Sequence, residues 1–105
     1  ANQVLMHEMA HKLDMLDGSI NGHPPLHAYM NEKVWFEAFE AAYEHLNKQL
    51  ELGKKTAINP YAATNAAEFF AVMTEYFFEA PQVLNRNYPK VYQQLVLFYQ
   101  QDPLS

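Results

Sequence analysis

The chain has 105 residues, of which half are apolar and 14% are aromatic, so it can form one hydrophobic core. Seven basic residues against twelve acidic ones give a net charge of -5, which argues against a basic face for nucleic-acid binding. The absence of cysteine excludes disulfides and thiolate metal ligands, and no run of about 18 apolar residues predicts a membrane span.

Glycine, proline and asparagine residues divide the chain into predicted helices and loops. In chain order these are a helix over 2–17, a loop over 18–30, a helix over 31–52, a loop over 53–64, a helix over 65–79 and a helix over 88–101. Gly18 and Gly53 stand where a helix end favours a left-handed residue, and Asn31 is a suitable N-cap for the second helix. Pro81 follows the third helix, and this interpretation predicts no regular element between the third helix and the fourth.

No run of residues alternates with a period of two, so we predict a single all-α unit of about four helices. The third helix is apolar nearly all round, which is typical of a buried helix. The chain starts at Ala1 within its first predicted helix, so we expect it to be a piece of a longer protein. No signal peptide is readable there, so a cytoplasmic location is the default expectation.

An HExxH motif, His7-Glu8-Met9-Ala10-His11, lies in the first predicted helix. Four residues of helix turn through about 400°, so the two imidazoles lie one turn apart on the same face. At that spacing both rings can reach one tetrahedral metal ion about 2.0 Å from each nitrogen. Glu8 lies about 100° away, where its carboxylate can accept a proton from water instead of binding the metal. A chance match is expected in well under about 1% of chains of this length.

A site of this kind needs a third protein ligand, and two candidates follow the motif closely. Asp17 stands six residues after His11, as in the HExxHxxGxxD pattern, but position 14 holds aspartate where that pattern has the glycine of a sharp turn. Asp14 lies about 10 Å from His7 along the helix axis, which is too far for sharing one metal ion. Both are therefore weak candidates.

The other candidates are carboxylates on the third predicted helix, at Glu68, Glu75 and Glu79. A carboxylate in such an apolar helix is costly unless it is paired or binds a metal, and this argument is strongest for Glu68. A different reading makes Glu68 a capping-box partner of Asn65 at the start of the helix. Asp14 and Glu75 are also the carboxylates that could accept a hydrogen bond from the second nitrogen of a metal-bound imidazole.

Two blocks of sequence resemble the Mlc titration factor A family of zinc-dependent peptidases. They are residues 7–18 (HEMAHKLDMLDG) and residues 61–72 (YAATNAAEFFAV). The resemblance extends over nearly the whole chain, with both blocks in the expected order. The second block is also similar to the metal-binding helix of anthrax lethal factor.

The resemblance implies a gluzincin-type zinc metallopeptidase, with aminopeptidase-like action as one form of its activity. It makes His7, His11 and Glu68 the ligands of one zinc ion, Glu8 the general base and Tyr61 the hydroxyl that faces the reaction centre. It also implies a cytoplasmic protein with a peptide or protein substrate, and a link to the glucose-regulated transcriptional repressor Mlc.

The resemblance also implies a larger fold than this chain can form. Family members have an upstream half with a sheet whose edge strand holds the substrate, so we expect this chain to be the helical C-terminal part of a zincin-like α+β domain. Without that sheet we expect zinc binding, little or no peptidase activity, and self-association through the apolar backs of the first and third helices. The competing function is a non-catalytic module that binds a repressor and uses zinc structurally.

Overall fold

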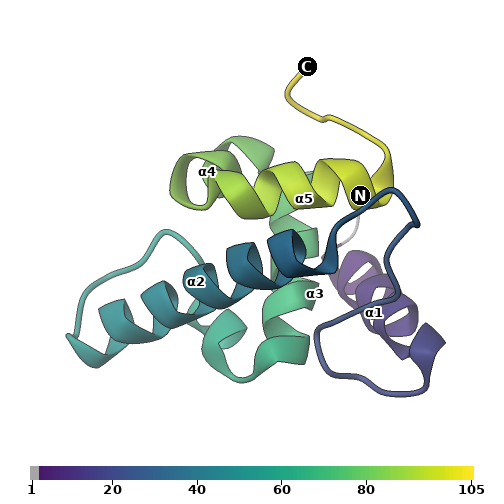
Figure 1. Ribbon diagram of the computed structural model, residues 1–105. Helices are drawn as coiled ribbons and strands as arrows, with labels where there is room; N and C mark the ends of the chain where they lie inside the picture. Colours follow the sequence, from purple (N-terminus) through teal and green to yellow (C-terminus); the bar gives the residue numbers. More distant parts are fainter. Residues whose placement is uncertain (1–2) are drawn as a thin grey trace.

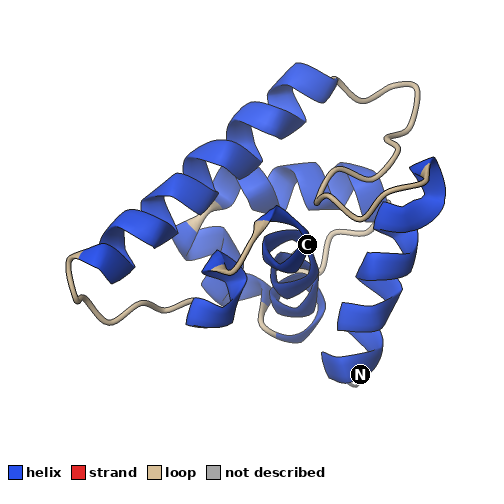
Figure 2. Ribbon diagram, turned by 90° about the horizontal axis from the view of Figure 1, so that it is seen from below, coloured by secondary structure: helices blue, strands red, loops and turns tan. Residues whose placement is uncertain are grey.

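The computed structural model describes residues 3–105, and this part of the chain is helical without a strand. Its elements are α1 (Gln3–Asp14), η1 (Met15–Asp17), α2 (Glu32–Glu51), η2 (Pro60–Ala63), α3 (Ala66–Glu79), α4 (Pro81–Asn87) and α5 (Pro89–Tyr99), where η denotes a 3-10 helix. Figures 1 and 2 show their arrangement. The predicted all-α class is confirmed. The predicted start of the first helix, at residue 2, lies outside the described residues.

Asparagine side chains cap the N-termini of two of the long helices. The Oδ1 atom of Asn31 accepts a hydrogen bond from the Val34 amide at 3.1 Å at the start of α2. Asn65 does the same for the Glu68 amide at 2.8 Å at the start of α3. Each cap satisfies one of the amides that a helix leaves unpaired at its N-terminus.

The structure differs from the sequence prediction in several places. The last helix ends at Tyr99 and not at residue 101, because Gln100 turns to a left-handed φ of 56°, and the predicted loop over 53–64 contains η2. The first helix is α-helical only to Asp14 and then narrows to the 3-10 turn η1, after which Gly18 adopts a φ of 96°. The helix α4 occupies a segment for which no regular element was predicted. Pro81 is compatible with the first turn of a helix, because that turn does not need its N–H group. The proline therefore ends one helix and begins the next.

The helix α3 lies in the middle of the molecule, where it contacts α1, α2, α4 and α5 (Figure 1). Its fully buried side chains form the centre of the core, and they include Phe69, Phe70, Met73 and Phe77. Trp35 of α2 stacks on Phe39 and packs against Phe70, with ring centroids 4.2 and 6.0 Å apart. The predicted burial of this helix is therefore correct.

The expectation that the apolar back of the third helix would be uncovered is wrong, because α2, α4 and α5 of this chain cover it. The first helix is less covered than the third, because its Val4 and Leu5 are 68% and 64% exposed. Self-association thus stays a prediction that rests on α1 alone. Among the described residues no helix combines the length and the apolar character needed to cross a membrane.

Candidate metal centre

The helix α1 brings the two motif histidines together. The rings of His7 and His11 have centroids 4.7 Å apart and meet edge to face at 82°. Their Nε2 atoms point to the same place and are 3.1 Å apart. The helical spacing of four residues accounts for this, because it stacks the two side chains one turn apart on one face.

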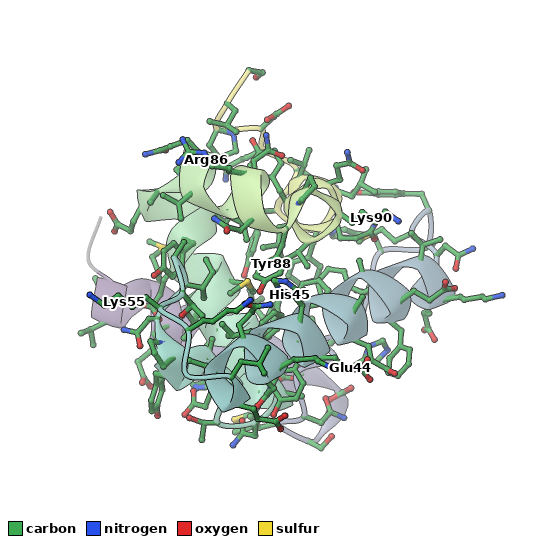
Figure 3. The ribbon with its side chains drawn as sticks, turned by 90° about the vertical axis from the view of Figure 1, so that its left-hand side faces the viewer. Glu44, His45, Lys55, Arg86, Tyr88 and Lys90 are labelled. Carbon is green, nitrogen blue, oxygen red and sulfur yellow. The ribbon has the colours of Figure 1, made fainter. Side chains whose placement is uncertain are left out.

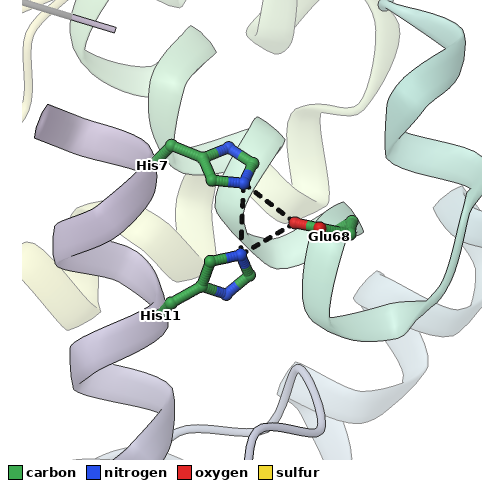
Figure 4. Close-up of side chains that lie close together, drawn as sticks. All are labelled: His7, His11 and Glu68. Carbon is green, nitrogen blue, oxygen red and sulfur yellow. Dashed lines mark hydrogen bonds and ion pairs between the residues drawn. The ribbon is translucent and has the colours of Figure 1, made fainter. Parts of the chain in front are cut away.

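The helix α3 supplies a carboxylate to the same point. The Oε1 atom of Glu68 lies 2.8 Å from the Nε2 atom of each imidazole. Figure 4 shows the three side chains converging. The amide of Glu68 donates a hydrogen bond to the side chain of Asn65, which is one of the two bonds of a capping box. The carboxylate of Glu68 turns to the histidines instead of making the other. Both readings of Glu68 from the sequence therefore describe part of its surroundings.

Glu75, two turns further along α3, fixes the orientation of one ring. Its Oε2 atom lies 2.7 Å from the Nδ1 atom of His7. A carboxylate accepts hydrogen bonds, so Nδ1 carries the proton and a neutral His7 presents a lone pair at Nε2. This is the carboxylate–histidine arrangement that commonly supports a metal-bound imidazole.

The donor set fits a metal ion. A lone pair of His7 then faces the Oε1 atom of Glu68 at 2.8 Å, which is repulsive unless a proton or a cation lies between them. Three ligands of a tetrahedral zinc ion stand about 3.4 Å apart, given bond lengths of about 2.1 Å. The separations of 2.8 to 3.1 Å are only slightly shorter, so small side-chain movements would make room. Across the described part of the chain, these three residues are the one such group, with ligand atoms within 4.8 Å of one another.

The electrostatics of the surrounding protein groups favour positive charge at this point. Burial acts to lower the pKa of His7, but hydrogen bonds to Glu75 and Glu68 outweigh it and hold the pKa above its ordinary value. Burial acts to raise the pKa of Glu68, but hydrogen bonds from Tyr61, His11 and His7 outweigh it and hold the pKa below its ordinary value. Glu68 therefore stays ionised, as a metal ligand must.

Tyr61 and Glu8 stand beside the three ligands. The hydroxyl of Tyr61 donates a hydrogen bond of 2.7 Å to the Oε2 atom of Glu68, which raises the pKa of the phenol. Tyr61 is 51% exposed, and Glu8 is exposed as well. Both border a groove of about 530 Å³ next to His7. The other lining residues are Val4, Asn59, Val72, Glu75, Tyr76, Glu79 and Ala80.

Two predicted carboxylates lie elsewhere. Asp14 is fully buried and accepts hydrogen bonds from the backbone amides of Gly22 and His23. It makes none of the hydrogen bonds to the imidazoles that the sequence suggested, because the end of α1 directs it to the following loop. Asp17 is exposed and accepts a bond of 3.3 Å from the Ser19 amide. The described contacts therefore join Glu75, and not Asp14, to a ring nitrogen.

Sequence reasoning missed the groove residues Val72 and Tyr76. A signal for them was available, because they follow Glu68 at intervals of four residues and so share its face of α3. The Nδ1 atom of His11 is buried without a hydrogen-bond partner among the residues described, so no protein group orients this ring as Glu75 orients His7.

A second cluster lies on another face and forms no metal-binding group among the described residues. Figure 3 shows His45 of α2 beside Tyr88, at the start of α5, with the Nδ1 atom and the hydroxyl 3.0 Å apart. They border a groove of about 700 Å³ between α2 and α5. No carboxylate converges with this histidine to form a metal-binding group within residues 3–105.

Comparison with known proteins relates the chain to a family of metallo-peptidases. Residues 1–100 match the sequence model of the glucose-regulated metallo-peptidases M90, and the chain belongs to this family. The resemblance to the Mlc titration factor A family is thereby confirmed, whereas the likeness to anthrax lethal factor stays a prediction.

Individual relatives are similar over almost the whole chain. An uncharacterized protein of Synechocystis is 46% identical over 103 residues, which are 98% of this chain and 38% of that protein. Mlc titration factor A of Yersinia pestis and of Yersinia pseudotuberculosis is 41% identical over 105 residues, covering 97% of this chain and 38% of each relative. The chain thus spans well under half the length of the curated relatives it matches.

Proposed function

We propose that this chain forms the zinc-binding centre of a metallopeptidase. The observation that carries the proposal is the convergence of two imidazole nitrogens and one carboxylate oxygen within 3.1 Å of one another. Membership of a metallopeptidase family supports it. His7, His11 and Glu68 hold one zinc ion, and the groove beside them takes the peptide.

Held by these three residues, a zinc ion would supply Lewis-acid chemistry, which acidifies water and polarises a carbonyl group. Glu75 keeps the proton of His7 on Nδ1, so that Nε2 remains available as a ligand. The carboxylate of Glu68 keeps its charge, because the Tyr61 hydroxyl donates a hydrogen bond to its Oε2 atom and the cation would lie beside its Oε1 atom.

Glu8 acts as the general base in this proposal. It follows His7 directly, is exposed and borders the groove, so its carboxylate can accept the proton of the attacking water and pass it to the leaving nitrogen. Tyr61 borders the same groove with a protonated hydroxyl. In this structure the hydroxyl donates its one proton to Glu68. Released from that contact, it can donate to the oxygen of the tetrahedral intermediate, for which one well-placed donor contributes roughly 3 kcal/mol.

The biological setting belongs to the same proposal. Relatives carry the name Mlc titration factor A, and the family is described as glucose-regulated. We propose that the protein to which this chain belongs acts in the cytoplasm on a peptide or protein substrate and is linked to the repressor Mlc. The chain is proposed to be the helical C-terminal part of a larger zincin-like domain.

The substitution Glu8→Gln tests the catalytic proposal. It removes the base and keeps the three ligands, so zinc affinity should stay within about twofold while peptide hydrolysis falls by at least about 100-fold, the lower range for a general base. Hydrolysis is measured on the chain together with any flanking sequence that its gene encodes. A wild-type protein that binds zinc and Mlc but cleaves no peptide would favour the non-catalytic module instead.

A further inference from the structure

A buried carboxylate at the end of α1 connects the motif helix to the next loop. Asp14 is 0% exposed and stands three residues after His11. Its Oδ2 atom accepts a hydrogen bond of 2.6 Å from the Gly22 amide, and its Oδ1 atom accepts one of 3.2 Å from the His23 amide. A buried carboxylate is costly unless it is hydrogen-bonded, so these two amides hold the loop firmly against the end of α1.

The same loop touches the first residue of α3. A Cβ atom added to Gly22 would lie 2.3 Å from the carbonyl oxygen of Ala66 and 2.5 Å from its carbonyl carbon. Gly22 also has a φ of 78°, a backbone conformation that residues with a side chain rarely adopt. The loop backbone is therefore in direct contact with α3 only two residues before Glu68.

Gly18 provides the contrast. Its φ of 96° is equally unusual, yet nothing lies within 4 Å of an added Cβ atom. The glycine at position 22 thus has a packing role that the one at position 18 lacks. The side chain of Asp14 is what holds it in this place.

We propose that Asp14, Gly22 and Ala66, which we call the α1–α3 bridge, set the position of Glu68 relative to the two histidines. Asp14 is then a positioning residue that acts on the third ligand through the loop. The inference rests on the proposed zinc site. Loss of a group that supports a metal ligand commonly weakens metal affinity about 10- to 100-fold, and the bridge should act at the lower end of that range.

Two substitutions disturb the bridge in different ways. Asp14→Asn keeps the shape of the side chain but replaces one acceptor oxygen with an amino group that faces a backbone N–H. Gly22→Ala leaves the carboxylate in place and pushes against the backbone of Ala66. Gly18→Ala is the matched control, because it introduces similar backbone strain without a contact to α3.

The zinc affinity of each variant is measured by competition with a chromophoric chelator, and thermal unfolding of the metal-free protein is measured alongside. We expect Asp14→Asn and Gly22→Ala to weaken zinc binding by about tenfold. Gly18→Ala should lower the melting temperature but keep the zinc affinity within about twofold. A purely structural role would lower the melting temperatures alone and leave the affinity of the folded protein unchanged.

A double-mutant comparison tests whether the effect passes through the third ligand. In a Glu68→Ala background, Asp14→Asn should no longer weaken the remaining zinc affinity. If it weakens that affinity by the same factor as in the wild type, Asp14 does not act through Glu68 and the inference is overturned. If Asp14→Asn does not fold, as judged by its helical circular dichroism, Gly22→Ala decides the matter.

The two proposals fail in different ways. A wild-type chain that binds no zinc above background would overturn the proposed function. A wild-type chain that binds zinc, with Asp14→Asn and Gly22→Ala retaining its affinity, would overturn only the α1–α3 bridge. Equal losses in Gly18→Ala and Gly22→Ala would also overturn the bridge, because strain alone would then explain them.

Discussion

Two pairs of histidines in this chain have the same spacing and different structures. His7 and His11 stand four residues apart in α1, and their Nε2 atoms are 3.1 Å from each other. His23 and His27 also stand four residues apart, but they lie in the loop that contains two prolines. The spacing brings two side chains together only where the backbone is helical, so it predicts a metal site in one segment and not in the other.

The second pair contributes to the fold instead. The Nε2 atom of His27 donates a hydrogen bond of 2.8 Å to the carbonyl oxygen of Phe98, in the last turn of α5. The ring of His27 stacks on Tyr29, whose hydroxyl donates to the carbonyl of Leu97. The loop therefore pairs with carbonyl groups that the end of α5 leaves free.

The largest expected effect separates the two pairs directly. His7→Ala or His11→Ala removes one of three protein ligands, so zinc affinity should fall by more than about 100-fold, beyond what loss of a supporting hydrogen bond causes. His23→Ala and His27→Ala should keep zinc affinity within about twofold. Competition with a chelator measures all four. Comparable losses in both pairs would contradict the assignment of the site.

The identity of the third ligand gives the next effect. Glu68→Ala should weaken zinc binding strongly, because its Oε1 atom lies 2.8 Å from both ring nitrogens. Asp17→Ala should leave the affinity unchanged, because Asp17 bonds only to the Ser19 amide among the described contacts. The same titration measures both. If Asp17→Ala strips the metal and Glu68→Ala does not, the assignment of Glu68 as the third ligand is wrong.

A smaller effect tests the support of His7. Glu75→Ala removes the acceptor for the Nδ1 proton, so zinc affinity should fall by about tenfold. Glu75→Gln keeps a neutral acceptor and should recover part of the loss. Isothermal titration with zinc compares the two variants. An alanine variant with wild-type affinity would show that the 2.7 Å contact does not support a ligand.

The smallest effect concerns the loop histidine. His27→Ala removes one hydrogen bond to a helix-end carbonyl, so the free energy of unfolding should fall by about 1 kcal/mol. Urea unfolding of the metal-free chain measures this change. A loss of zinc affinity in the same variant would mean that His27 belongs to the metal site after all.

Short-range sequence patterns predicted most of the fold. Asn31 and Asn65 were readable because capping depends on a residue and its neighbours three positions along. The helix α4 was missed because Pro81 is compatible both with the end of a helix and with the first turn of another. Its flanking residues alone do not distinguish these cases.

The role of Asp14 could not be predicted for a different reason. Its partners are backbone amides at Gly22 and His23, and every residue other than proline has such an amide. The composition of the loop therefore holds no sign of the contact. The sequence offered an imidazole as one possible partner of this carboxylate, and a salt bridge or a helix cap as equally good alternatives.

The sequence alone determines the pairing of His7 with His11, because helical geometry acts over four residues and needs no other part of the chain. The tertiary structure alone decides that Glu68 reaches both rings and that Glu75 reaches one, because 57 to 68 residues separate these partners. Their convergence depends on how α1 packs against α3. Two features bring this packing about: α3 is buried between the other helices, and the 18–30 loop contacts Ala66. No local spacing carries that information, since it arises only when the core is formed.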